Sequence, residues 1–136
     1  MIERVHEHII DELRTNTRTD TIFVLTAIIL NLLTLAINSV AAAAARVEEG
    51  RTATFIMFTF VALLLVVNFV AEVGLIKGRQ TRTKLLNGLI KMYKDHGVES
   101  YYDPSLVVAY KTRYNLFMLA VLFTGLIALI IPFVIR

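Results

Sequence analysis

The sequence contains no cysteine. This excludes disulfide bonds, thiolate metal sites, cysteine nucleophiles and palmitoylation at cysteine. The sequence also lacks a Ser-His-Asp framework, a phosphate-binding glycine loop, an HExxH motif and a carboxylate pair within its apolar segments. The three histidines, His6, His8 and His96, match no standard metal-ligand spacing. We therefore expect no enzymatic activity, no cofactor and no metal site.

Charged residues are scarce and unevenly placed. They make up 18% of the chain against 57% hydrophobic residues, and none lies in residues 21–45, 52–71 or 114–135. A helix of about 20 residues crosses a hydrocarbon core of about 30 Å, and inside lipid the backbone must satisfy its own hydrogen bonds. The sequence therefore predicts an all-α integral membrane protein, a single membrane domain over residues 1–136, with transmembrane helices at 21–45, 52–76 and 114–135.

The connection between the first two predicted spans is short. Only residues 46–51 separate the charge-free stretches, so we expect an antiparallel helical hairpin, with Gly50 ending the first helix.

Basic residues predict the orientation. Residues 77–113 carry eight of the fourteen Lys and Arg residues, and residues 1–19 carry Arg4, Arg14 and Arg18. Only Arg46, Arg51 and Arg136 fall on the other side of three spans. Because loops rich in Lys and Arg stay in the cytoplasm, we expect a cytoplasmic amino terminus, a basic cytoplasmic loop and a location in the plasma or inner membrane.

Two segments outside the spans have helical amphipathic patterns. In residues 1–19 apolar residues recur from Ile2 to Leu13 at helical spacing, and a second pattern runs from Leu85 to Tyr93 within the 77–113 loop. We expect cytoplasmic amphipathic helices that lie on the membrane or on a partner helix. Asp20 is a candidate cap for the first span, although a continuous helix through residues 15–21 fits the pattern equally well.

Glycine and proline mark the other expected boundaries. Gly78 should loosen the chain after the second span, and Gly97 should end the loop helix. Asp103 and Pro104 predict the cap and first position of the last helix, which should reach about Ile131 before Pro132 ends or kinks it.

Polar residues within the predicted spans are the candidate site. In the first span Asn31, Thr34 and Asn38 share one face with small alanines. This face suits either helix packing through interhelical hydrogen bonds or the lining of a water-filled path. In the second span Asn68 lies at a depth similar to that of Asn31, so the two amides should be able to bond. Glu72, one turn further on, is either an ion or proton site or is paired with a neighbouring cation or amide.

The basic residues of the loop are expected to contact anionic lipid rather than nucleic acid, because the adjoining spans hold them at the membrane surface. The predicted contacts are Lys77, Arg79, Arg82, Lys84, Lys91 and Lys94. Four tyrosines should form an aromatic belt at the inner interface. They are Tyr101, Tyr102, Tyr110 and Tyr114.

These features favour one function class, described first, and leave a second as the alternative. In the first, copies of the chain form a homo-oligomeric channel whose ion path is lined by the polar face of the first span, with Glu72 favouring cations. In the second, the chain is a noncatalytic accessory or scaffold subunit that docks on a larger membrane protein. In both function classes the chain lies in a lipid bilayer, and in neither does it bind nucleic acid.

Overall fold

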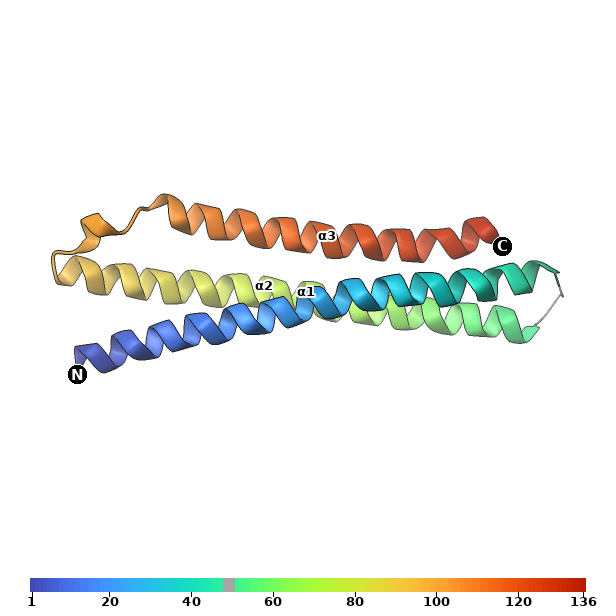
Figure 1. Cartoon of the computed structure of the whole chain (residues 1–136), viewed down its shortest axis with the longest axis horizontal. Helices are drawn as coiled ribbons and strands as arrows, with labels where there is room; N and C mark the ends of the chain where they lie inside the picture. Colours follow the sequence, from blue (N-terminus) through green and yellow to red (C-terminus); the bar gives the residue numbers. More distant parts are fainter. Residues whose placement is uncertain (48–50) are drawn as a thin grey trace.

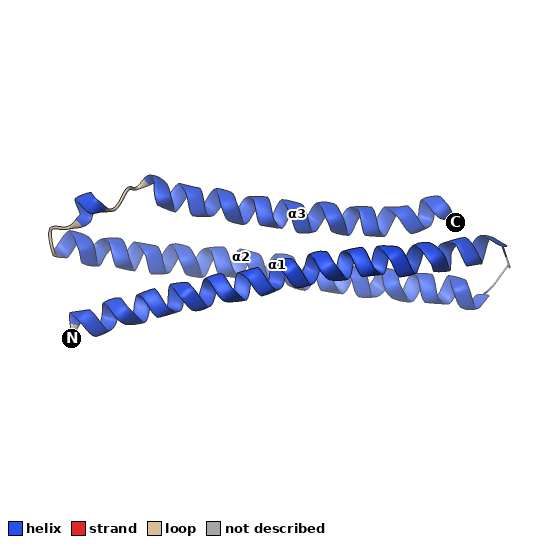
Figure 2. Ribbon diagram, viewed as in Figure 1, coloured by secondary structure: helices blue, strands red, loops and turns tan. Residues whose placement is uncertain are grey.

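The computed structural model describes residues 1–47 and 51–136 and is 94% helical. Helix α1 spans Ile2–Val47, α2 spans Arg51–Asp95 and α3 spans Ser105–Ile135, with a short 3-10 helix, η1, at Glu99–Tyr101 (Figures 1 and 2). All three long helices are long and apolar enough to cross a membrane. Gly50, the predicted end of the first span, lies outside the described residues.

The amphipathic segments are not separate helices. Residues 2–19 are the first part of α1, and residues 77–95 are the last part of α2. Asp20 is therefore in the middle of a helix, so of the two alternatives for this segment the structure has the continuous helix and not the cap. Gly78 lies within α2 and does not interrupt it. At about 1.5 Å per residue, α1 and α2 each extend well beyond the thickness of a hydrocarbon core.

Gly97 ends α2 as predicted. It has a φ of 71°, which side chains with a Cβ rarely adopt. The N–H of Gly97 bonds to the carbonyl of Lys94, and the N–H of Val98 bonds to the carbonyl of Tyr93. This pair of hydrogen bonds is the Schellman pattern, which satisfies carbonyls that the helix end leaves without donors.

The start of α3 also agrees with the sequence prediction. Asp103 Oδ1 accepts a 2.9 Å hydrogen bond from the backbone N–H of Ser105, and Pro104 already has helical dihedral angles. At the other end α3 does not stop near Ile131 but continues through Pro132 to Ile135, the last residue of the predicted span. A proline in the last turn removes only one intrahelical hydrogen bond there.

The three helices form one elongated bundle in which α1 and α2 are antiparallel and α3 runs parallel to α1 (Figure 1). The buried positions recur largely at steps of seven or of three and four residues. In α1 they include Leu13, Asp20, Ala27 and Thr34, and in α3 Tyr114, Val121 and Ala128. This spacing keeps one seam of each helix facing its neighbours along the bundle.

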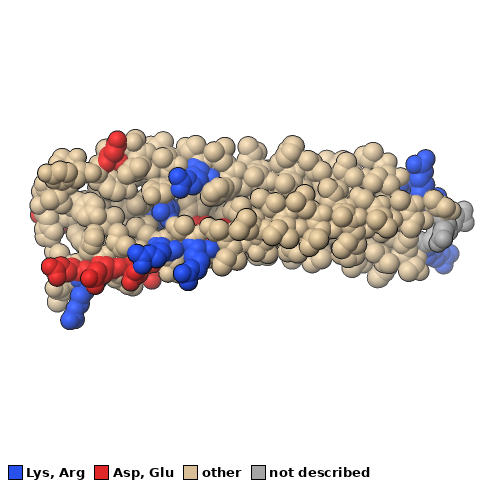
Figure 3. All heavy atoms as spheres, in the orientation of Figure 1, with Lys and Arg blue, Asp and Glu red and all other residues tan. Residues whose placement is uncertain are grey.

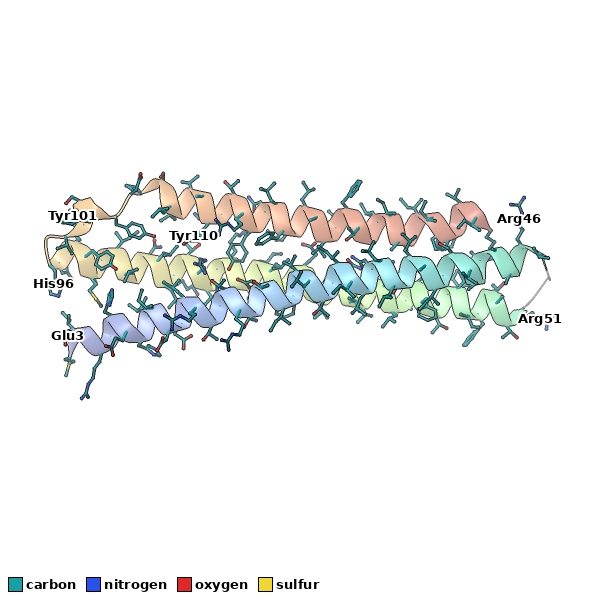
Figure 4. All side chains as sticks on the ribbon, in the orientation of Figure 1. Glu3, Arg46, Arg51, His96, Tyr101 and Tyr110 are labelled. Atoms are coloured by element: carbon teal, nitrogen blue, oxygen red, sulfur yellow. The ribbon has the colours of Figure 1, made fainter. Side chains whose placement is uncertain are left out.

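Charge divides the bundle along its length. We call residues 21–45, 52–76 and 114–135 the apolar section, and residues 2–19 and 77–113 the charged end. Figure 3 shows Lys, Arg, Asp and Glu gathered at the charged end, a long stretch without such residues, and further basic residues at the opposite end. Arg46 and Arg51 lie at that opposite end (Figure 4).

The apolar section is apolar on the outside and partly polar inside. Large side chains such as Leu25, Ile29 and Leu33 are about half exposed, whereas Asn31 and Asn38 are fully buried. A soluble bundle shows the reverse distribution. Surfaces of this kind suit contact with lipid or with other membrane helices.

At the charged end the two amphipathic patterns pack on each other. Leu13 of α1 and Leu86 and Leu89 of α2 form a buried cluster. Tyr102 and Tyr110 pack against this cluster, and burial raises the pKa of Tyr102. Of the expected aromatic belt, Tyr101 is exposed, but Tyr114 is buried inside the bundle, so its assignment to an interface was wrong.

Candidate functional site

Asn31 and Asn68 form the central polar contact of the apolar section. Asn68 Nδ2 donates to Asn31 Oδ1 at 2.7 Å, and Asn31 Nδ2 donates to Asn68 Oδ1 at 3.1 Å. Asn31 Nδ2 also donates to Thr124 Oγ1 of α3 at 2.9 Å. The expected bond between the two amides is therefore present, and it joins all three helices at one level. The sequence analysis did not single out Thr124.

A close approach of α3 makes room for this contact. A Cβ at Gly125 would lie 2.5 Å from Asn68 Oδ1 and 2.8 Å from Asn68 Cγ, which is shorter than real contacts allow. The Asn68 amide cannot easily move away, because Nδ2 also donates to the carbonyl of Leu64 at 2.8 Å. Gly125 is therefore required by the geometry of the amide pair, as small residues commonly are where membrane helices pack closely.

A second polar contact lies where the apolar section meets the charged end. The Asp20 carboxylate is 5% exposed and accepts hydrogen bonds from the Tyr114 hydroxyl and from Asn16 Nδ2. Asn16 Nδ2 also donates to Tyr114 at 2.9 Å. Gly78 of α2 packs directly on this carboxylate, since an added Cβ would meet it. Small size, not flexibility, is what this position requires.

An apolar layer separates the two polar contacts. Ala27 of α1, Ala71 and Leu75 of α2 and Val121 of α3 form one buried cluster between them. No more than 3% of any of these side chains is exposed. Water and ions would have no polar partner along this layer, so the interior of one chain does not provide a continuous polar path.

Thr34 and Asn38 extend the inward face of α1 toward the opposite end. Thr34 is 5% exposed and Asn38 is fully buried. Neither Asn38 Nδ2 nor Asn38 Oδ1 has a hydrogen-bond partner within the described part of the chain. The predicted polar face of the first span is thus turned into the bundle along its whole length, which favours helix packing over the lining of a path.

Glu72 stands apart from these contacts. It is half-buried on α2, and its Oε1 is buried without a hydrogen-bond partner in the described residues. Among residues 1–47 and 51–136, the one ion pair joins Asp11 and Arg14 on the surface of α1 and does not involve Glu72. Pairing with Lys77 or Arg79, one of the two interpretations of this residue, is not seen.

Two of the basic residues expected at lipid make contacts within the bundle. Arg79 donates to Asn115 Oδ1 at 2.7 Å, and Arg82 donates to Thr17 Oγ1 at 2.6 Å. The Arg82 guanidinium lies 4.1 Å from the centre of the Tyr110 ring. Lys77, Lys84, Lys91 and Lys94 are exposed.

The two polar contacts join the three helices to one another. In the described ranges, no three His, Asp or Glu side chains gather as metal ligands would. No protein family model matches the chain, and no curated protein or solved structure matches it. The function must therefore be inferred from the geometry of the chain itself.

Proposed function

We propose that the chain is a multi-pass membrane protein whose apolar section crosses the bilayer and whose charged end lies in the cytoplasm. The charge-free band, the apolar outer surface and the excess of Lys and Arg at one end support this proposal. The extensions of α1 and α2 would then continue the bundle beyond the membrane surface.

The absence of cysteine allows a direct test of this topology. Single-cysteine variants at Arg46 and at Ser100, both exposed, place one thiol at each end of the bundle. We expect a membrane-impermeant maleimide to label the Arg46→Cys variant in intact cells and the Ser100→Cys variant only after permeabilisation. The opposite labelling pattern would reverse the proposed orientation.

Within that membrane we infer a noncatalytic accessory or scaffold role, in which the chain docks on a larger membrane protein. The observation that carries this inference is the direction of the polar face of α1. The Asn31 amide is bonded to α2 and α3 of the same chain, Asn38 is buried inside the bundle, and the surface left for partners is apolar. A preformed bundle with an apolar exterior suits lateral contact with other membrane helices.

The first experiment is the mass of the native assembly after extraction in a mild detergent, with identification of every chain in it. We expect a larger membrane protein present in fixed stoichiometry. Recovery of the chain alone, or as a homogeneous ring of copies, would contradict the accessory role.

A homo-oligomeric channel is the second candidate, and Glu72 is the observation that favours it. Its unpartnered carboxylate oxygen lies within the apolar section, where acidic groups are rare and commonly functional. Symmetric copies would bring these carboxylates together between protomers, since the interior of each bundle is filled. Under this proposal Glu72→Gln should change cation flux in liposomes, and Asn31→Leu should disturb it through packing. Unchanged flux in both variants would exclude the channel.

A further inference from the structure

A groove lies between α1 and α3 at the junction of the charged end and the apolar section. Its volume is about 370 Å³, and α2 contributes one residue to it. Figure 3 shows this face hollowed at the charged end, with basic atoms beside the hollow. The lining residues are Thr17, Asp20, Thr21, Arg82, Tyr110, Arg113, Tyr114 and Phe117.

Arg82 is held in place within this groove. Its Nη1 donates to Thr17 Oγ1 and, at 3.4 Å, to the carbonyl of Leu13, while its guanidinium stacks on the Tyr110 ring. Its Nε is buried and has no hydrogen-bond partner within the described residues. A guanidinium whose side chain is already fixed in this way loses little conformational entropy when it binds an anion, because no further ordering is required.

Arg113 supplies a second guanidinium. It lies 5.6 Å from the centre of the same Tyr110 ring, so both guanidinium groups lie near one aromatic side chain. Figure 4 shows Tyr110 reaching from α3 into the space between the helices. The Asp20 carboxylate also borders the groove, but it accepts hydrogen bonds from Tyr114 and Asn16. The lining therefore has a net positive formal charge.

The level of the groove indicates the source of the anion. Thr21 and Tyr114 are the first residues of their charge-free stretches, and Phe117 continues the wall toward the apolar section. In a bilayer, phosphate groups lie at this boundary and acyl chains lie beside the apolar section. A guanidinium pair matches the oxygens of a phosphate better than single ammonium groups do.

We propose that this groove binds the phosphate of an anionic phospholipid between Arg82 and Arg113, with an acyl chain running past Phe117. The proposal rests on the membrane insertion proposed above. Arg113, which was not among the lipid contacts predicted from the sequence, thereby becomes a phosphate ligand. The proposal also separates Arg82 and Arg113 from the exposed lysines, which would contribute only general attraction to a negative surface.

The test uses the full chain in phosphatidylcholine nanodiscs that contain increasing fractions of phosphatidylglycerol, with bound phosphatidylglycerol counted by native mass spectrometry. We compare Arg113→Gln with Lys94→Gln, which removes the same charge from an exposed site outside the groove. We expect saturable binding of phosphatidylglycerol to wild type. Arg113→Gln should weaken it at least about tenfold, because a hydrogen bond to a charged group is lost, and Lys94→Gln should leave it near wild type.

Equal weakening in both variants would overturn the proposal, since it would indicate general surface attraction. Full competition by inorganic phosphate at millimolar concentration would assign the groove to a free anion and overturn the lipid assignment. Resistance of each protein to alkaline extraction is measured in parallel. If the chain resists extraction but shows no saturable binding, only the lipid site is refuted. If alkali releases the chain, membrane insertion is refuted as well.

Discussion

Gly125→Ala tests whether the amide pair requires the close approach of α3. The added methyl group would lie within 3 Å of two atoms of the Asn68 side chain. Because Asn31 and the Leu64 carbonyl both hold that amide, relief of the clash must break a hydrogen bond or push α3 outward. We expect overpacking to cost about 1–3 kcal/mol, against about 0.5–1 kcal/mol gained from replacing glycine within a helix. With the middle value of each range, the expected net loss is about 1 kcal/mol.

Gly88→Ala is the matched control. Gly88 lies within α2, and a Cβ there would meet only Ile9 Cδ1 at 3.9 Å, which is an ordinary contact. This variant should therefore gain about 0.5–1 kcal/mol of stability. The measurement is pulse proteolysis of each protein in mixed micelles across a titration with sodium dodecyl sulfate, read as the fraction of intact chain.

A second substitution separates the clash from other effects of the methyl group. In the double variant Gly125→Ala with Asn68→Ala, the clashing amide is absent. The combined loss should be smaller than the sum of the two single losses, because the methyl group then occupies space that the amide has left. If Gly125→Ala is as stable as wild type, or if the losses add, the inferred approach of α3 to Asn68 is incorrect.

Two further predictions concern the charged end. Gly97→Ala should destabilise the turn after α2 by about 1 kcal/mol or more, because alanine resists a φ of 71°, and the loss should appear as faster amide hydrogen exchange near Val98. The hydrogen bond from the Ser105 backbone N–H lowers the pKa of Asp103, so the stabilisation by this carboxylate should be present above its unfolded pKa and disappear as the pH falls through its folded pKa. Asp103→Asn should remove that acid dependence of proteolysis at the start of α3, and an unchanged profile would refute it.

The sequence was sufficient for the three apolar helical segments and for the central polar contact. Runs without charge located the apolar section, and the helical spacing of Asn31, Thr34 and Asn38 placed them on one face. Depth along the predicted hairpin then paired Asn31 with Asn68, as the structure has it. These predictions succeeded because they depend on the helical spacing of side chains and on the length of the charge-free runs. Both are patterns that extend over many residues.

The contacts at the junction could not be predicted in the same way. An aspartate before an apolar run resembles a helix cap, and a tyrosine at the end of a span resembles an interfacial anchor. Asp20 and Tyr114 instead satisfy each other inside the bundle, which requires two helices far apart in sequence to meet at one level. The seven-residue step from Leu13 through Asp20 to Ala27 was the available signal, because it continues without a break across the predicted helix boundary.

Asn38 gives a test that separates the two function classes. Its amide is fully buried and unpartnered within the described residues, and a buried polar group without a hydrogen bond costs about 1–3 kcal/mol. Asn38→Leu replaces it with an apolar side chain that suits the membrane interior, so if the residue only packs we expect unfolding by sodium dodecyl sulfate to require more detergent. Asn38→Ala is the control for lost volume and should be less stable than the leucine variant. A leucine variant that is destabilised, and that also loses cation flux in liposomes, would show that the amide serves a hydrated path and would favour the channel over the accessory role.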